Sequence, residues 1–401
     1  MNLRILSIAL LAFTGSAFAS LSSLPQDSGQ GAAPTEVRIG GLDGGWRRTP
    51  LGPLRLTTLD ADTARLRFSG NAAVLPDAGF TVRLLSGDTI HGTVAAGDEA
   101  VLGLRVRGGA EVALPIEAVR ELRAVDLRDQ VGLDAPEAGD RLWRRVGEAF
   151  DRVDGLLVAF GSAGVTFEGQ LGEREYPWAE VGALWVEPLG GAPTFDAGSR
   201  AVAVDLVDGS RLRGGFERLE NGKLFLDVGD DEALVFDAAG LLEVNLDDAR
   251  LAFVSELEFE PVGPPGLFGD DLGLRVPPVR DRAVVGTPLM AGGTAFARGL
   301  GVHAPSRLRL DWTAGGTLRG AVAIDDSVQR LAVDGAVIFR IHLDGEQVFE
   351  TDELTVESPL VALPALDLTG KRTIELEVDA ASGSVMGDRA NWLDLCITRE
   401  G

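Results

Sequence analysis

The chain has 401 residues, and its 61 Asp and Glu residues outnumber its 37 Lys and Arg residues, for a formal net charge of −24 at pH 7. A chain this long exceeds one ordinary hydrophobic core, so we expect about two to four domains. Apolar residues make up 45% and charged residues 24%, proportions typical of globular rather than disordered proteins. The negative charge repels nucleic acid and anionic lipid, which argues against a nucleic-acid partner.

The first residues have the pattern of a secretory signal peptide. Arg4 supplies a positive charge, Ile5–Phe13 is an apolar run broken by one Ser, and a small-x-small pattern ends at Ala19. We therefore expect residues 1–19 to be cleaved off between Ala19 and Ser20, with export to the periplasm, the cell surface or the medium. The alternative is an N-terminal membrane anchor, but the run is too short to span a bilayer. We expect no membrane insertion after cleavage.

A weak repeat follows the segment 20–36, whose Ser, Gly, Pro and Gln content predicts a flexible linker. In each copy of the repeat, a turn signal and a candidate strand precede apolar residues at offsets 0, 2, 5 and 8. Offset 2 suits a strand, and offsets 5 and 8 suit one helical turn leading into another strand. The three copies are Leu114, Ile116, Val119 and Leu122; Tyr176, Trp178, Val181 and Leu184; and Leu234, Phe236, Ala239 and Leu242.

Each copy resembles in pattern a small SH3-like barrel, which is built from two hairpins and a closing short helix. The alternative is that the copies are hairpins of one larger β domain. Apolar spacing near 3.6 within Asp140–Phe150 predicts a short helix before the second unit. The expected boundaries are unit one with the N-terminal strands at 37–126, the helix and unit two at 127–188, a linker at 189–200, and unit three at 201–250.

From about residue 251 onward, apolar and polar residues alternate as they do in half-buried strands. Between two of these segments, Asp344-Gly345 is a type I′ hairpin signal. Antiparallel strands without intervening helices predict a β-sandwich, and the whole chain is therefore expected to be all-β. The predicted strands lie at 256–260, 307–310, 337–343, 374–378 and 393–397.

Four ordered motifs in this region resemble the NPCBM domain, a carbohydrate-binding module first described beside family 98 glycoside hydrolases. The resemblance covers residues 251–401 and implies a galactose-binding-like jelly roll with a polysaccharide or glycan as ligand. Two positions depart from the family pattern, because Arg389 stands where the family has His and Asn391 where it has Asp. The motifs are 299–306 (GLGVHAPS), 324–326 (IDD), 339–345 and 388–392 (DRANW).

The motifs contain the candidate ligand-binding residues, and each has a structural alternative. His303 could bond a sugar hydroxyl or satisfy loop carbonyls. The Asp325–Asp326 pair could bond sugar hydroxyls, bind a structural Ca²⁺ or cap a turn. Trp392 could stack on a sugar ring or pack in the core. The full set is His303, Asp325, Asp326, Asp388, Arg389, Asn391 and Trp392.

No catalytic motif stands out, and three His residues in 401 leave little for acid–base chemistry near neutral pH. The single Cys396 excludes intrachain disulfides and is expected to be a buried, inert thiol. We expect no catalytic residue and no cofactor, with Ca²⁺ left open. The leading hypothesis is an exported, non-catalytic carbohydrate-binding protein. The alternative is a structural or protein-interaction module with cell-envelope protein partners, and the third is a cryptic glycan-active enzyme.

Overall fold

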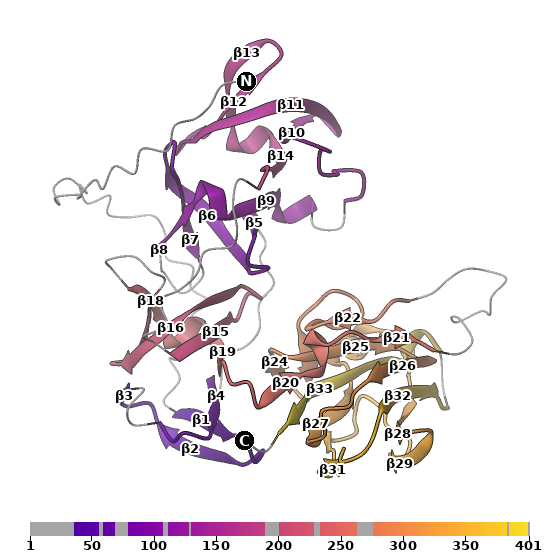
Figure 1. Cartoon of the computed structure of the whole chain (residues 1–401). Helices are drawn as coiled ribbons and strands as arrows, with labels where there is room; N and C mark the ends of the chain where they lie inside the picture. The colour runs from indigo at the N-terminus through magenta and orange to yellow at the C-terminus, as the bar shows by residue number, and fades with distance from the viewer. Residues whose placement is uncertain are drawn as a thin grey trace. The chain divides into compact units, whose positions relative to one another are not determined.

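The computed structural model contains strands and short 3₁₀-helices, with no α-helix among the residues it describes (Figure 1). The predicted all-β class is therefore confirmed. Within the same residues, no helix is long and apolar enough to cross a membrane. The predicted signal peptide, residues 20–35 and residues 189–199 lie outside the described part. The structure describes residues 36–399 apart from 56–58, 69–78, 107–110, 128–129, 189–199, 228–232, 263–275 and 383–384.

Three consecutive segments repeat one order of elements: four strands, a 3₁₀-helix and a fifth strand that pairs with the first. The first consists of β5 (Phe80–Leu84), β6 (Thr89–Gly97), β7 (Val101–Val106), β8 (Glu111–Pro115), η2 (Ile116–Ala118) and β9 (Val119–Ala124). The second consists of β10 (Asp140–Val146), β11 (Ala149–Phe160), β12 (Gly164–Gly169), β13 (Gly172–Pro177), η4 (Trp178–Glu180) and β14 (Val181–Trp185). The third consists of β15 (Arg200–Leu206), β16 (Arg211–Glu220), β17 (Lys223–Asp227), β18 (Leu234–Asp237), η5 (Ala238–Gly240) and β19 (Leu241–Leu246).

The predicted helical turn leading into a strand is present in every copy of the repeat, but the third copy was aligned two residues too early. In the first two copies the residue at offset 2 is the first residue of the 3₁₀-helix. In the third copy the 3₁₀-helix begins at Ala238, two residues after Phe236, which the prediction had placed at offset 2. Apolar residues fill both alignments, so the spacing alone could not separate them. The correct third set is Phe236, Ala238, Leu241 and Val244, all buried.

The predicted helix within Asp140–Phe150 is wrong, because these residues form β10 and the start of β11. The two strands pair from Asp140 opposite Gly155 to Val146 opposite Ala149. Only two residues separate them, and the first, Gly147, has a φ of 61°. A positive φ at this point suits a tight hairpin turn and interrupts a helix.

Among the described residues, the three segments and four N-terminal strands share one hydrogen-bonded sheet of 19 strands and one apolar core. Strand β9 pairs with β14, and β6 touches β16 through one pair of residues. The N-terminal strands, expected with unit one, instead pair with the third segment, β4 with β19 and β3 with β16. The SH3-like assignment and the unit boundaries stay predictions. These N-terminal strands are β1 (Glu36–Gly41), β2 (Trp46–Pro50), β3 (Leu54–Arg55) and β4 (Thr63–Phe68).

The C-terminal region is a sandwich of two antiparallel sheets that share one core, as predicted. In that core the rings of Phe339 and Trp392 meet edge to face, with centroids 5.0 Å apart. One sheet consists of β20 (Leu251–Phe253), β22 (Val279–Arg280), β25 (Gly299–His303), β27 (Thr317–Ile324), β30 (Val361–Ala362), β31 (Leu366–Asp367) and β33 (Arg389–Thr398). The other consists of β21 (Glu260–Pro261), β26 (Ser306–Asp311), β28 (Val337–Leu343), β29 (Glu346–Glu350) and β32 (Thr373–Ala380).

Two local predictions in this region have opposite outcomes. The hairpin at Asp344-Gly345 is confirmed, because both residues have positive φ, 54° and 83°, as a type I′ turn requires. The strand predicted over 256–260 is wrong for most of its length. Val254–Glu256 forms a 3₁₀-helix, and only Glu260 lies in a strand, β21. Alternation over five residues is too short a pattern to separate a strand from a turn.

A small hairpin, β23 (Leu289–Ala291) and β24 (Thr294–Phe296), covers the outer face of the β25–β33–β27 sheet. Leu289 and Phe296 pack there against Leu393 of β33. On its other side, Ala295 of the hairpin joins a small apolar cluster with Leu242 of β19. The hairpin therefore lies between the sandwich and the third segment.

A β-bulge in β33 turns one acidic side chain out of the sandwich. Asp394 has a φ of 51°, and the pairing with β27 shifts register between Arg319 and Ala321. Trp392 before the bulge and Leu395 after it both point into the sandwich core, so the bulge supplies the extra residue. Asp394 is consequently free to reach the N-terminal strand β4.

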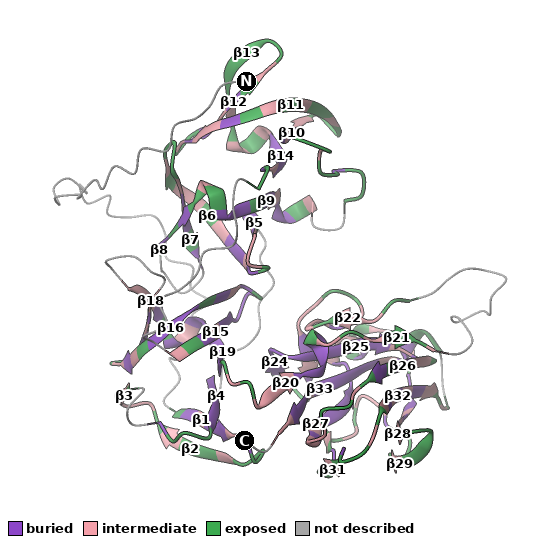
Figure 2. Cartoon of the chain, in the orientation of Figure 1, coloured by how far each residue is buried: buried purple, intermediate pink, exposed green. Residues whose placement is uncertain are grey.

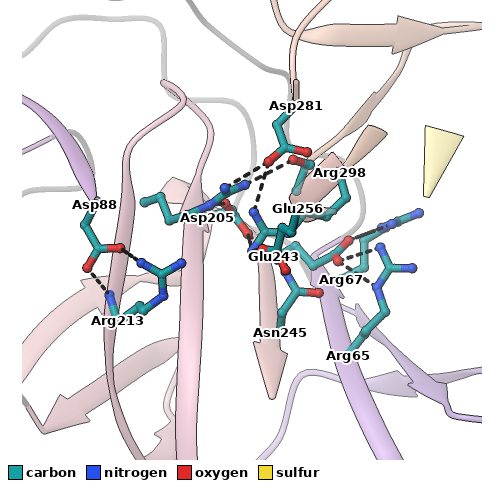
Figure 3. A network of polar contacts seen from close by, with 12 residues as sticks. Arg65, Arg67, Asp88, Asp205, Arg213, Glu243, Asn245, Glu256, Asp281 and Arg298 are labelled. Atoms are coloured by element: carbon teal, nitrogen blue, oxygen red, sulfur yellow. Dashed lines mark hydrogen bonds and ion pairs between the residues drawn. The ribbon is translucent and has the colours of Figure 1, made fainter. Parts of the chain in front are cut away.

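Asp394 completes a buried cluster of two guanidinium and two carboxylate groups. Glu243 lies opposite β4 in the sheet and accepts hydrogen bonds from the Nε atoms of Arg65 and Arg67, each at 2.7 Å. Asp394 accepts from the same two arginines, each at 2.6 Å. Figure 3 shows Arg65 and Arg67 converging on Glu243. The pairing explains why every residue of β4 is buried (Figure 2), although Arg65 and Arg67 had the alternation of a half-exposed strand.

The cluster predicts a large loss of stability when one charge is removed. Glu243→Gln keeps the volume of the side chain but leaves two buried arginines with one carboxylate. Breaking a buried pair in this way costs about 3–5 kcal/mol. We expect a decrease of that size in the free energy of unfolding, measured by denaturant titration. Glu111→Gln is the control, because the Arg105–Glu111 pair is 57% exposed on both sides and should contribute less than ~1 kcal/mol. Equal, small effects of the two substitutions would contradict the structural role of the cluster.

Candidate functional site

Three strand ends bring most of the predicted site residues together at one end of the sandwich. His303, at the end of β25, lies opposite Arg389, at the start of β33. The backbone N–H of Asp325, directly after β27, donates to the Arg389 carbonyl at 2.9 Å. Neighbouring antiparallel strands thus place motifs that are distant in the sequence side by side.

Asp325 and Asn391 are structural partners inside this end of the sheet. The Asn391 side-chain amide donates to Asp325 Oδ2 at 2.6 Å, and both residues are at most 1% exposed. Asp325 also accepts from the backbone N–H of Ser327 at 2.9 Å, which caps the helix η8 (Asp326–Arg330). Its Oδ2 accepts from the Met290 N–H at 3.3 Å. The pair therefore fixes η8 and the β23–β24 hairpin against the sheet.

Asp326 is half-buried and binds the turn of that hairpin. Its two carboxylate oxygens accept from the backbone N–H groups of Gly292 and Gly293 at 2.9 and 2.7 Å. The turn-capping alternative therefore describes both members of the Asp pair. Among the described residues, no group of three or more His, Cys, Asp or Glu could hold a metal ion.

Asp388 and His303 form the base of the site. Asp388 is 2% exposed and accepts from the Ala336 N–H at 3.0 Å. Burial raises the pKa of this carboxyl above its usual value, opposed by that hydrogen bond and by the charge of nearby His303. The His303 ring is half-buried, and its Nδ1 lies 2.8 Å from the Ala304 carbonyl. A carbonyl only accepts, so Nδ1 carries the proton in this contact.

Trp392 is fully buried, so the structure gives its ring no face for a sugar, and the core alternative describes it. Cys396 is also buried, and burial raises the pKa of its thiol to about 11, which keeps it protonated and inert at neutral pH. Of the seven predicted residues, three are half-buried and the other four are buried; the three are His303, Asp326 and Arg389. Arg389 donates to the Ser327 hydroxyl at 3.2 Å.

Two cavities with charged residues in their lining were missed by the sequence analysis. One, of about 870 Å³, lies beside β1 and β2 and is lined by Trp46 and Arg319, among others. The other, of about 710 Å³, is lined by Asp205, Glu256 and Asp281. Their walls come from segments up to hundreds of residues apart, and no spacing pattern connects such residues. Trp46, followed directly by Arg47 and Arg48 in β2, was the one local signal.

The second cavity has the carboxylate network drawn in Figure 3. Arg211 bridges Asp205 at 2.7 Å and Asp281 at 2.9 Å. Glu256 has a single ion pair described, a long contact of 3.8 Å to Arg298. Burial raises the pKa of Asp205 and of Glu256. The arginines neutralise the carboxylates. The main role of the network is therefore structural, because it holds β15 and β16 against the loop at Asp281.

The fold is that of a β-sandwich module preceded by a larger antiparallel sheet. Residues 269–398 match the family model of the NPCBM/NEW2 domain, which confirms the resemblance read from the four motifs. No protein among the curated ones matches the chain.

Two solved structures from Clostridium perfringens are similar to parts of the chain. One is CBM51 from GH95, in complex with methyl-galactose, at 20% identity and a TM-score of 0.32, with 37% of this chain and 99% of that chain covered. The other is CBM51-2 with INT domains from ZmpB, in complex with GlcNAc, at 22% identity and a TM-score of 0.32, with 44% and 37% covered. Scores this low do not define a fold, so the architecture depends on the strand pairing described above.

The buried carboxyl of Asp388 predicts an unusual stability profile. Its pKa is higher in the folded than in the unfolded chain, so its ionisation opposes folding at neutral pH, and this penalty disappears as the pH falls through the folded pKa. Asp388→Asn keeps an oxygen for the Ala336 N–H and removes the ionisation. We expect a higher thermal midpoint than wild type at pH 8 and no difference below the pKa of an unfolded Asp, about 3.9. A lower midpoint at pH 8 would show that the carboxylate is needed.

Proposed function

We propose that the C-terminal sandwich binds a glycan at the end formed by β25, β27 and β33. The observation that supports this most is the convergence there of His303, Asp326 and Arg389 within a domain that matches NPCBM/NEW2. All three side chains are half-buried, on three neighbouring strand ends. Loops and strand ends on a rigid sandwich are where binding groups commonly lie.

Binding would depend on hydrogen bonds to sugar hydroxyls. Arg389 offers several N–H donors, His303 offers Nε2, and the Asp326 oxygens have lone pairs beyond those used by Gly292 and Gly293. The buried Asp325–Asn391 pair positions these groups and does not touch the ligand. With Trp392 in the core, stacking contributes nothing at this site, so we expect modest affinity.

We also propose that this site is not catalytic. Hydrolysis of a glycosidic bond by the usual route needs two carboxyl groups flanking the bond. Here Asp325, Asp326 and Asp388 each accept hydrogen bonds from backbone N–H groups of the protein. Those bonds fix the carboxyls as structural acceptors rather than as an acid–base pair.

Glycan-array and affinity-electrophoresis measurements on the full mature chain test the binding proposal. Arg389→Ala and His303→Ala should each weaken retention by about tenfold, the equivalent of one charge-assisted hydrogen bond. Arg309→Ala on the opposite sheet, whose side chain is 47% exposed, is the control and should bind as wild type does. If the folded chain binds no glycan but co-purifies with a stoichiometric cell-envelope protein, the interaction-module alternative replaces this proposal.

Export is part of the same proposal and has its own test. The apolar run of residues 5–13 and the small residues ending at Ala19 support signal cleavage before Ser20. Mass spectrometry of the protein expressed in a Gram-negative host should find a mature N-terminus at Ser20 outside the cytoplasm. Ala19→Arg should block processing and leave the precursor associated with the membrane. A cytoplasmic chain beginning at Met1 would contradict export.

A further inference from the structure

The 870 Å³ groove lies between the N-terminal strands and the sandwich, away from the end described above. One wall comes from β1, β2 and the turn between them. The other comes from β27 and the end of β33. Thr63, Thr317 and Thr398 line it, together with the partly exposed side chain of Trp46. The lining also includes four arginines, Arg47, Arg250, Arg319 and Arg399, and three carboxylates, Asp43, Asp60 and Asp62.

Three of these guanidinium groups have acceptors from the protein. Arg47 pairs with Asp60 at 3.0 Å, and Arg250 pairs with Asp62 and Asp248, each at 2.8 Å. Arg399 donates to the Ala249 carbonyl. Arg319 differs, because no hydrogen bond or ion pair joins it to any residue the structure describes, and its Nε is buried without a partner. The described protein thus offers Arg319 no acceptor, and a guanidinium of this kind can pair with an anionic ligand.

Arg319 is also held in place. It belongs to β27, opposite Cys396 of β33. The turn between β1 and β2 closes over it: a Cβ on Gly44, whose φ is 80°, would lie 2.7 Å from the Arg319 Cδ. The stem of the side chain is therefore confined, so less rotamer entropy is lost when the guanidinium binds a ligand.

Trp46 provides a fixed aromatic surface in the same groove. The guanidinium carbons of Arg65 and Arg67 lie 5.2 and 4.9 Å from the centre of its ring, and that of Arg38 lies 5.1 Å away. The buried charge cluster thus anchors the ring from behind. An amphipathic ring held next to hydroxyl and guanidinium groups suits a sugar, which has apolar C–H surfaces and polar edges.

We propose that this groove binds an acidic glycan, with its carboxylate or sulfate on Arg319 and a sugar ring against Trp46. The site is separate from the sandwich end, and the proposal takes only the glycan class from the proposed function. A neutral sugar in the groove would cover the Arg319 guanidinium without pairing its charge, and such a group costs binding free energy. The acid group is therefore the feature that selects the ligand.

Calorimetry on the full mature chain, with oligogalacturonate, dextran sulfate and neutral dextran, tests the proposal. Binding of either acidic glycan with no binding of dextran is expected, and the preferred one identifies carboxylate or sulfate as the ligand group. Arg319→Gln should weaken it by at least about tenfold, and Arg319→Lys, which keeps the charge but not the planar fork, by less. Arg309→Gln is the matched control and should have no effect.

The proposals for the two sites can be tested independently of each other. Arg389→Ala should leave binding of the acidic glycan unchanged, and Arg319→Gln should leave binding at the sandwich end unchanged. Circular dichroism and thermal unfolding of both Arg319 variants show whether they are folded. The proposal is overturned if folded Arg319→Gln binds as wild type does, if dextran binds equally well, or if inorganic sulfate displaces the glycan at equal concentration.

Discussion

The charge cluster of Arg65, Arg67, Glu243 and Asp394 is the constraint on which the arrangement of the sheet and the sandwich depends. Its four groups are neutral in sum, and their oxygens and nitrogens satisfy one another at 2.6 to 2.7 Å. A buried pair of this kind gains little over an apolar contact, but losing one partner leaves a charge without water or counter-charge. The main effect of the cluster is therefore to specify how β4 and β19 are joined to β33. Its net contribution to the free energy of folding is smaller.

One bulge makes that join possible and lies next to Arg319 of the groove. Asp394, as the extra residue in β33, faces the N-terminal strands, and the residues on either side keep their places in the core. On the opposite edge of the bulge, β27 presents Arg319 to the groove beneath the β1–β2 turn. Nearer the start of β33, Arg389 and Asn391 lie at the sandwich end. The motif residues thus include buried scaffold groups such as Asn391 and half-buried groups such as Arg389.

Local patterns predicted much of the fold and less of the sites. The Asp344-Gly345 hairpin and the strands around Leu308, Phe339 and Leu376 follow from rules that involve neighbours in the chain. Asp140–Phe150 was misassigned because its apolar spacing fits a helix and a hairpin equally well, and Gly147 decided between them. Site residues such as Asp325 and Trp392 were identified as candidates, but their burial depends on what packs over them.

The sequence by itself determined the all-β class, the repeated strand–3₁₀–strand units and the sandwich, because each depends on periodicity and turn chemistry within a few residues. Only the tertiary structure decided which polar residues are buried. The Arg65 and Arg67 side chains alternate with apolar neighbours as exposed residues would. They can be buried because the carboxylates of Glu243 and Asp394 pair with their charges. Likewise, Arg319 lacks a partner among the described residues, whereas the other three arginines of the groove each have one. Pairing between distant charges leaves no trace in local spacing, so it appears only when the chain is folded.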